Sequence, residues 1–78
     1  SKFGYLTPPQ RIAVLEHYRT FLLTLRDHYR TLSQQVPHNP EVMEVERPYI
    51  MRFLESRVHI FEEELAWLDH QVAELTND

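Results

Sequence analysis

Two long runs of apolar residues at helical spacing dominate this sequence, and a short break bounded by prolines separates them. The first run places an apolar residue at every third or fourth position, at Ile12, Leu15, Tyr18, Leu22, Leu25, Tyr29, Leu32 and Val36. The second run does the same at Ile50, Leu54, Val58, Phe61, Leu65, Leu68, Val72 and Leu75. Such intervals bring side chains to one face of an α-helix. The sequence therefore predicts two amphipathic helices, over about residues 8–36 and 48–76.

Local signals indicate where these helices begin and end. Thr7 can cap a helix that starts at Pro8, and Gln10 completes the reciprocal pattern of a capping box. Prolines at 37 and 40 end the first helix, and about residues 40–47 are expected to form a short helical connector. Because Pro48 has no amide hydrogen, it either starts the second helix or kinks a longer one. A start is the favoured interpretation.

The expected fold is all-α: an antiparallel hairpin of two long amphipathic helices with a short helical connector. Each helix would be roughly 42 Å long, at 1.5 Å per residue. The 78 residues allow a single domain over 1–78, and the absence of cysteine means that no disulfide stabilises its small core. A sheet is not expected, because Gly4 is the only glycine and no Asn-Gly pair marks a hairpin turn.

Each helix also carries a second apolar stripe. These stripes contain Val14, Phe21 and His28 in the first helix, and Tyr49, Phe53, Ile60 and Trp67 in the second. Two helices cannot cover both stripes of each other, so the remaining surface predicts a homodimer that completes a helical bundle. The packing seam is expected at Tyr18, Leu22, Leu25 and Tyr29, opposite Leu54, Val58, Phe61, Leu65, Leu68 and Val72. Phe53 and Trp67 are expected either to pack in the same way or to line an apolar ligand pocket between protomers.

The charge is divided unevenly along the chain. The formal net charge of −4 argues against nucleic-acid binding by this chain alone. Residues 1–39 contain five basic and two acidic groups, whereas residues 40–78 contain three basic and ten acidic groups. Halves of opposite sign favour packing on each other or contact between copies. No apolar run approaches the roughly 18 residues that span a bilayer, so no membrane partner is expected.

Catalysis and cofactor binding have little support in the sequence. A metal-like cluster of Glu55, His59, Glu62 and Glu63 lies on one flank of the second helix, and His17 or His28 could complete it from the first. However, no Glu-x-x-His pair is repeated on two helices, as bundle di-metal sites require. These residues are expected to form a solvated flank with charge pairs such as Glu55 with His59. No catalytic residue, metal or cofactor is predicted.

Three motifs, in order, resemble the C-terminal helical domain of PadR-like transcriptional regulators. The motifs are KFGYLTPPQ at residues 2–10, RPYIMRFLE at 47–55 and EEELAWL at 62–68. The resemblance implies a dimerisation domain that positions two winged-helix DNA-binding domains on successive operator half-sites. It also implies a cytoplasmic location and an aromatic or amphiphilic small-molecule effector near the domain junction or the dimer interface.

This sequence departs from the family pattern in one large respect, because it contains no winged-helix segment. No DNA-contacting residue can therefore be assigned within it. The chain begins with Ser1 rather than Met, so it is expected to be a fragment of a longer protein. The alternative interpretation is a free-standing helical-hairpin adaptor that binds a helix of an unrelated partner. A small metal- or ligand-binding bundle is a third hypothesis.

Overall fold

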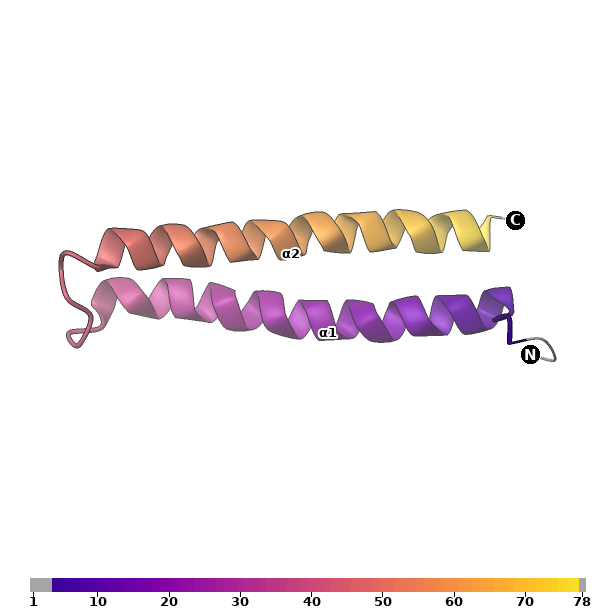
Figure 1. Cartoon of the computed structure of the whole chain (residues 1–78), viewed down its shortest axis with the longest axis horizontal. Coiled ribbons are helices and arrows are strands. Elements are labelled where there is room, and N and C mark those ends of the chain that lie inside the picture. Colours follow the sequence, from indigo (N-terminus) through magenta and orange to yellow (C-terminus); the bar gives the residue numbers. More distant parts are fainter. Residues whose placement is uncertain (1–3, 78) are drawn as a thin grey trace.

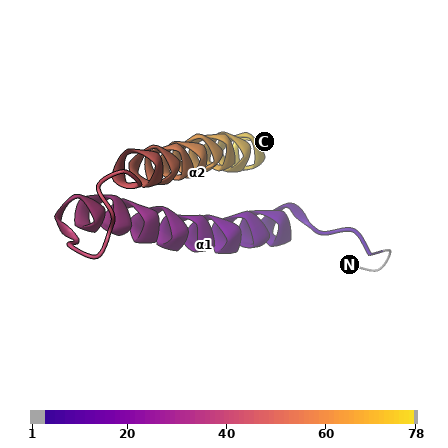
Figure 2. The same cartoon turned by 60° about the vertical axis from the view of Figure 1, so that its left-hand side comes forward.

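The computed structural model describes residues 4–77 and consists of two long antiparallel helices (Figure 1). Helix α1 spans Pro8–Gln35, the short 3₁₀ helix η1 spans Val36–His38, and helix α2 spans Arg47–Thr76. The two long helices lie side by side in both views, and the start of α1 and the end of α2 lie at the same end of the hairpin (Figures 1 and 2). The expected all-α hairpin is confirmed. No helix within residues 4–77 is long and apolar enough to cross a membrane.

Helix α1 begins with the expected capping box. The Thr7 hydroxyl accepts a hydrogen bond from the Gln10 amide at 3.3 Å, and the Gln10 side-chain oxygen accepts one from the Thr7 amide at 2.8 Å. Pro8 occupies the first helical position, where its missing N–H leaves no hydrogen bond unmade. These local interactions fix the start of α1, because they satisfy amides that have no partner within the helix.

The connector differs from the sequence prediction. Instead of a short helical segment over about residues 40–47, the helical turn lies earlier, at Val36–His38, and turns follow it. The side chain of Asn39 explains part of the difference, since its Oδ1 accepts a hydrogen bond from the Glu41 amide at 2.9 Å. Such a local side-chain bond offers the backbone an alternative to helical hydrogen bonding.

Arg47 organises the rest of the connector. Its guanidinium donates hydrogen bonds to the backbone carbonyl oxygens of Val36 and Val42, the latter at 3.0 Å. An arginine can satisfy several carbonyls at once because it presents five N–H donors in a planar fork. Pro48 then occupies the first turn of α2, and the amide of Ile50 makes a helical hydrogen bond to the Glu46 carbonyl at 3.0 Å. Pro48 therefore starts the helix and does not kink it.

The core is a single seam between α1 and α2. Its central cluster consists of Leu22, Phe61, Leu65 and Leu68, with Leu15, Leu23, Leu25 and Tyr29 packed against it. Leu54 and Val36 are also buried, towards the connector end of the hairpin. The molecule measures 57 × 21 × 15 Å and its radius of gyration is 17.7 Å. A compact domain of this length has a radius of gyration of about 11–12 Å, so one hairpin alone leaves much of its apolar surface uncovered.

Candidate self-association surface

Most of the residues expected in the packing seam join the two helices of one chain. The structure buries Leu22, Leu54, Phe61, Leu65 and Leu68 and leaves Leu25, Tyr29, Val58 and Val72 half-buried. Tyr18 lies at the edge of the seam, with 39% of its surface exposed. The helical spacing did not single out Leu23, which packs against the core from a position next to Leu22.

One flank of the seam is charged. Arg19 Nε lies 2.7 Å from Asp69 Oδ1, and Arg30 Nη2 lies 2.5 Å from Glu62 Oε1, so two ion pairs bridge α1 and α2. The hydrogen bond to Asp69 and the charge of this carboxylate raise the pKa of Arg19. Arg19 and Arg30 thus pair with carboxylates of the acidic second half, whereas Arg26 pairs with Asp27 of its own helix at 3.0 Å. This flank needs no further partner for its charges.

The opposite flank is apolar and rich in aromatic residues. We call it the aromatic face, and it consists of Val14, Tyr18 and Phe21 from α1 and Tyr49, Phe53, Ile60 and Trp67 from α2. Val14, Phe21, Phe53 and Trp67 are each 55–56% exposed. Large exposed apolar patches commonly mark the sites at which proteins associate.

Helix geometry explains why the two flanks differ. Successive residues of an α-helix are about 100° apart, so Tyr18 and Arg19 lie on opposite sides of the seam that Leu22 centres. On α2, Glu64 and Asp69 likewise lie on opposite sides of the seam. The hydrogen bond from the Tyr18 hydroxyl to Glu64 Oε1, at 2.9 Å, therefore marks the aromatic side, just as the Arg19–Asp69 pair marks the charged side.

Several rings of the aromatic face have aromatic or cationic neighbours on their own helix or in the seam. The rings of Tyr18 and Phe21 stack with centroids 6.3 Å apart, and the ring of Phe53 meets that of Tyr29 edge-on at 6.5 Å. The guanidinium of Arg52 lies 4.8 Å from the ring centroid of Tyr49. The hydrogen bond to Glu64 raises the pKa of Tyr18, and desolvation and the Glu64 charge act in the same direction. Among the described residues, Tyr18 is the aromatic residue whose side chain donates a hydrogen bond to the other helix, through its hydroxyl to Glu64.

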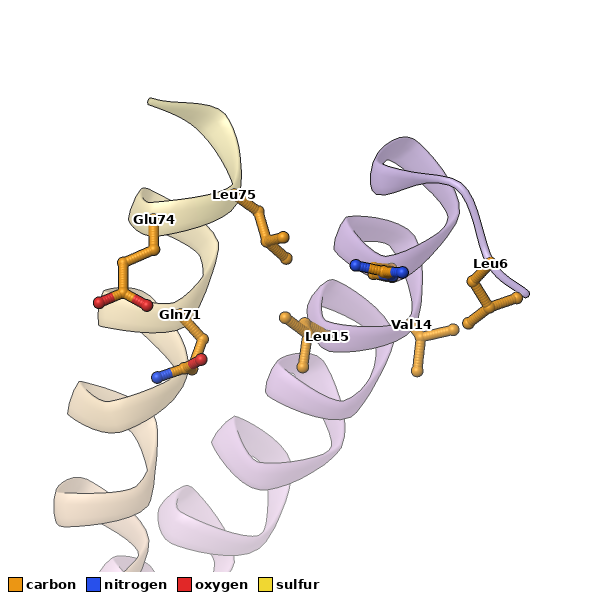
Figure 3. A pocket seen from close by; sticks show the side chains of 7 residues that line it. Leu6, Val14, Leu15, Gln71, Glu74 and Leu75 are labelled. Atoms are coloured by element: carbon orange, nitrogen blue, oxygen red, sulfur yellow. The ribbon is translucent and has the colours of Figure 1, made fainter. Parts of the chain in front are cut away.

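A groove of about 470 Å³ lies at the open end of the hairpin, between the start of α1 and the end of α2 (Figure 3). It is lined by Leu6, Arg11, Val14, Leu15, Gln71, Glu74 and Leu75. Leu15 and Leu75 project between the helices and form an apolar floor (Figure 3). Glu74 pairs with His70 at 3.0 Å, whereas Arg11 forms no ion pair within residues 4–77. Because Val14 belongs to both, the groove continues the aromatic face to the end of the molecule.

The two residues expected to line a ligand pocket behave differently. Trp67 borders a shallow depression of the aromatic face, together with Ile60, Glu63 and Glu64. Phe53 does not border this depression and packs against Tyr29 instead. The sequence did not predict the groove at the open end, because it depends on how the segment before α1 lies against α1.

The metal-like cluster does not assemble. His59 Nε2 lies 3.0 Å from Glu63 Oε1, and Glu62 pairs with Arg30 on the charged flank. Within residues 4–77, no group of three or more histidine or carboxylate side chains is placed to hold a metal ion. His59 pairs with Glu63 and not with Glu55, the expected partner, and Glu55 forms no ion pair within the described residues.

Comparisons with known proteins do not assign this chain to a family. No family model, no curated protein and no solved structure matches it. The resemblance to PadR-like regulators therefore depends on the sequence motifs alone, and Lys2 and Phe3 of the first motif lie outside the described residues. The aromatic face and the groove at the open end are the features from which a function can be argued.

Proposed function

We propose that this chain is a self-association module in which two copies pack their aromatic faces together and form a four-helix bundle. The observation that carries the proposal is the aromatic face itself, seven large apolar residues on one flank of a two-helix hairpin. Aromatic residues contribute strongly to association because each removes a large area from water. The opposite flank already pairs its arginines with carboxylates across the seam and offers no comparable driving force.

The small core supports the same proposal. Only Leu22, Phe61, Leu65 and Leu68 form the central buried cluster of a 78-residue chain without cysteine. Chains of this size commonly need a disulfide, a metal or oligomerisation to reach a stable fold. Packing a second hairpin on the aromatic face would enlarge the core from a seam between two helices to the centre of a bundle of four.

The wider setting of the proposal is a PadR-like transcriptional regulator in the cytoplasm, as the sequence motifs imply. In this setting the homodimer holds two winged-helix domains, encoded outside this sequence, at a fixed separation. DNA would be contacted by those domains only, consistent with the negative charge of this chain. A winged-helix coding segment upstream in the same reading frame would support this setting over the free-standing adaptor.

The effector site of such a regulator would be the groove at the open end. Its apolar floor of Leu15 and Leu75 suits an aromatic or aliphatic body, and Arg11 suits a carboxylate attached to it. Binding there would couple to DNA affinity if it changed the relative placement of the two hairpins. Titration with phenylacetate and with the neutral phenylacetamide tests this assignment: tighter binding of the acid, abolished by Arg11→Gln, is expected.

A charge placed on the aromatic face tests self-association directly. Phe21→Glu should convert the dimer into a monomer, because the carboxylate would be buried at the interface without a partner. Glutamate is a good helix former and Phe21 is outside the hairpin core, so the helix should persist. Leu65→Asp is less informative, because Leu65 lies in the core and its loss would unfold the hairpin itself.

Val45→Glu is the matched control, since Val45 is 66% exposed but lies in the connector, away from the aromatic face. Sedimentation equilibrium and circular dichroism on the parent, Phe21→Glu and Val45→Glu proteins would separate dissociation of the dimer from unfolding of the helices. A helical Phe21→Glu monomer beside a dimeric Val45→Glu protein is the expected pattern. A Phe21→Glu protein that remains as dimeric as the parent would exclude the aromatic face as the interface.

A further inference from the structure

We infer that His28 makes the self-association of this chain sensitive to pH: two copies associate while its imidazole is neutral and separate when it is protonated. This inference rests on the proposed self-association and adds its regulation. Histidine is the side chain whose charge ordinarily changes between pH 5 and 8. The position of His28 beside the aromatic face and the charges around it carry the inference.

His28 lies on the same side of α1 as the aromatic face. It follows Val14 and Phe21 at intervals of seven residues, which return to nearly the same side of an α-helix. Its ring, exposed in the single hairpin, meets the ring of Tyr29 edge-on at 5.7 Å. Because the Tyr29 ring also meets that of Phe53, His28 is level with Phe53 of α2. A partner that covers both Phe21 and Phe53 therefore also covers the imidazole.

The charged group of α2 at this level on the aromatic side is a cation. Phe61 contacts Tyr29, with ring centroids 5.6 Å apart, and the guanidinium of Arg57 lies 5.2 Å from the centroid of the Phe61 ring. Arg57 precedes Glu64, which binds Tyr18 on the aromatic side, by seven residues, so it lies on that side as well. It forms no ion pair within residues 4–77. A charge on His28 would thus be added to an existing positive charge.

The carboxylates near this level are directed elsewhere. Glu55 precedes Glu62 by seven residues, and Glu62 lies on the charged flank, where it pairs with an arginine of α1. Asp27, the neighbour of His28 in the sequence, pairs with Arg26 at 3.0 Å. The remaining titratable group of this part of α2 is a histidine that pairs within its own helix, His59 with Glu63. The hairpin itself therefore provides no carboxylate that would stabilise a protonated His28.

A second copy provides none either, in either symmetric arrangement. If its open end lies at the same end, its α2 faces His28 with the segment of Phe53 and Arg57. If its open end points the other way, its α1 faces His28, and the two carboxylates of Pro8–Gln35 are on other sides: Asp27 pairs with Arg26, and Glu16 is close enough to Arg19 for its charge to raise the pKa of that arginine. The aromatic-side carboxylates of α2 border the depression and the groove, towards the open end: Glu63, Glu64 and Glu74.

Protonation of His28 in the dimer would therefore cost hydration without a compensating ion pair. The dimer favours the neutral imidazole, so association is complete above the range in which histidine titrates and is lost as the pH falls through it. A histidine in water has a pKa of about 6.5, so about nine in ten are charged at pH 5.5, where carboxylates remain ionised. With one His28 in each copy, full exclusion of the charged form would weaken the dimer by about 100-fold between pH 7.5 and pH 5.5.

Sedimentation equilibrium at pH 7.5 and pH 5.5, with circular dichroism to follow helicity, tests the inference on the parent, His28→Gln and His17→Gln. Glutamine does not titrate in this range and is a good helix former. His17 is the matched control: it is an exposed histidine of α1, but its neighbour Tyr18 binds Glu64, so a carboxylate lies at its level. His59 and His70, which pair with carboxylates of α2, remain in both variants.

The dissociation constants of the parent and of His17→Gln should rise by up to about 100-fold on acidification, whereas that of His28→Gln should stay nearly constant. A dimer of the parent that is equally tight at both pH values, or a His28→Gln dimer that weakens as much as the parent, would overturn the role of His28 and leave the self-association standing. A parent chain that is monomeric at both pH values would overturn the proposed self-association, and the inference with it.

Discussion

At the scale of single residues, the molecule separates apolar side chains that look equivalent in the sequence. Leu68 is completely buried, whereas Trp67, one position away, is 55% exposed on the aromatic face. The spacing of the apolar residues predicted two amphipathic helices, each with two apolar stripes. It did not reveal which stripe of each helix packs against the other helix of the same hairpin. Tyr18 shows the consequence, because it was expected within the seam and lies at its edge, where its hydroxyl binds Glu64.

Leu68→Ala should be among the most destabilising substitutions in the chain. It removes a fully buried side chain from the central cluster and should lower the free energy of unfolding by about 2–5 kcal/mol. Urea denaturation followed by circular dichroism, at one fixed chain concentration, measures the loss. Met43→Ala, at a connector position that is 68% exposed, should change it by less than about 0.5 kcal/mol. Similar losses for both variants would contradict the position of the core.

Tyr18 makes stability depend on pH in alkaline solution. Its pKa is raised in the folded state by the hydrogen bond to Glu64, by desolvation and by the charge of that carboxylate. The contribution of this bond is therefore complete below the unfolded pKa of about 10 and is lost as the pH rises through the folded pKa. Tyr18→Phe lacks this dependence but keeps the other tyrosines. The stability advantage of the parent over Tyr18→Phe should shrink above pH 10, and a constant difference would contradict the bond.

At the scale of elements, the sequence predicted what local chemistry determines. The start of α1 follows from Thr7 and Gln10, which are three residues apart, and the start of α2 follows from Pro48. The connector was not predicted correctly, because its path depends on Arg47 reaching carbonyl oxygens as far back as Val36. A contact across 11 residues leaves no periodic signal. The groove at the open end was not predicted either, because it is formed by residues far apart in the sequence, from the segment before α1, the start of α1 and the end of α2.

The capping box gives an element-scale prediction. Thr7→Ala removes the acceptor for the Gln10 amide and should lower the free energy of unfolding by about 1 kcal/mol. Thr24→Ala is a control of identical chemistry in the middle of α1, where the hydroxyl binds only a carbonyl of its own helix. Because alanine is the better helix former, this control should not destabilise the chain. Thermal unfolding of both variants at equal concentration would show the difference, and equal effects would argue against a capping role for Thr7.

At the scale of the whole molecule, the hairpin is extended and two-sided. One flank joins its helices through ion pairs, and the other presents aromatic residues to solvent, so the two flanks have different roles. The opposite net charges of α1 and α2 favour their packing on each other within the hairpin. The sequence indicated this leftover apolar surface through its second stripes. It could not indicate which flank would be free, because that depends on how the helices rotate against each other.

The solution mass of the unmodified chain tests the central claim most directly. Light scattering coupled to size-exclusion chromatography, across a dilution series, should give about 19 kDa, twice the chain mass of 9.5 kDa. The mass should fall towards that of one chain only on strong dilution, as mass action requires. A helical, well-folded monomer of 9.5 kDa throughout the series would contradict self-association, and the aromatic face would then belong to a different partner.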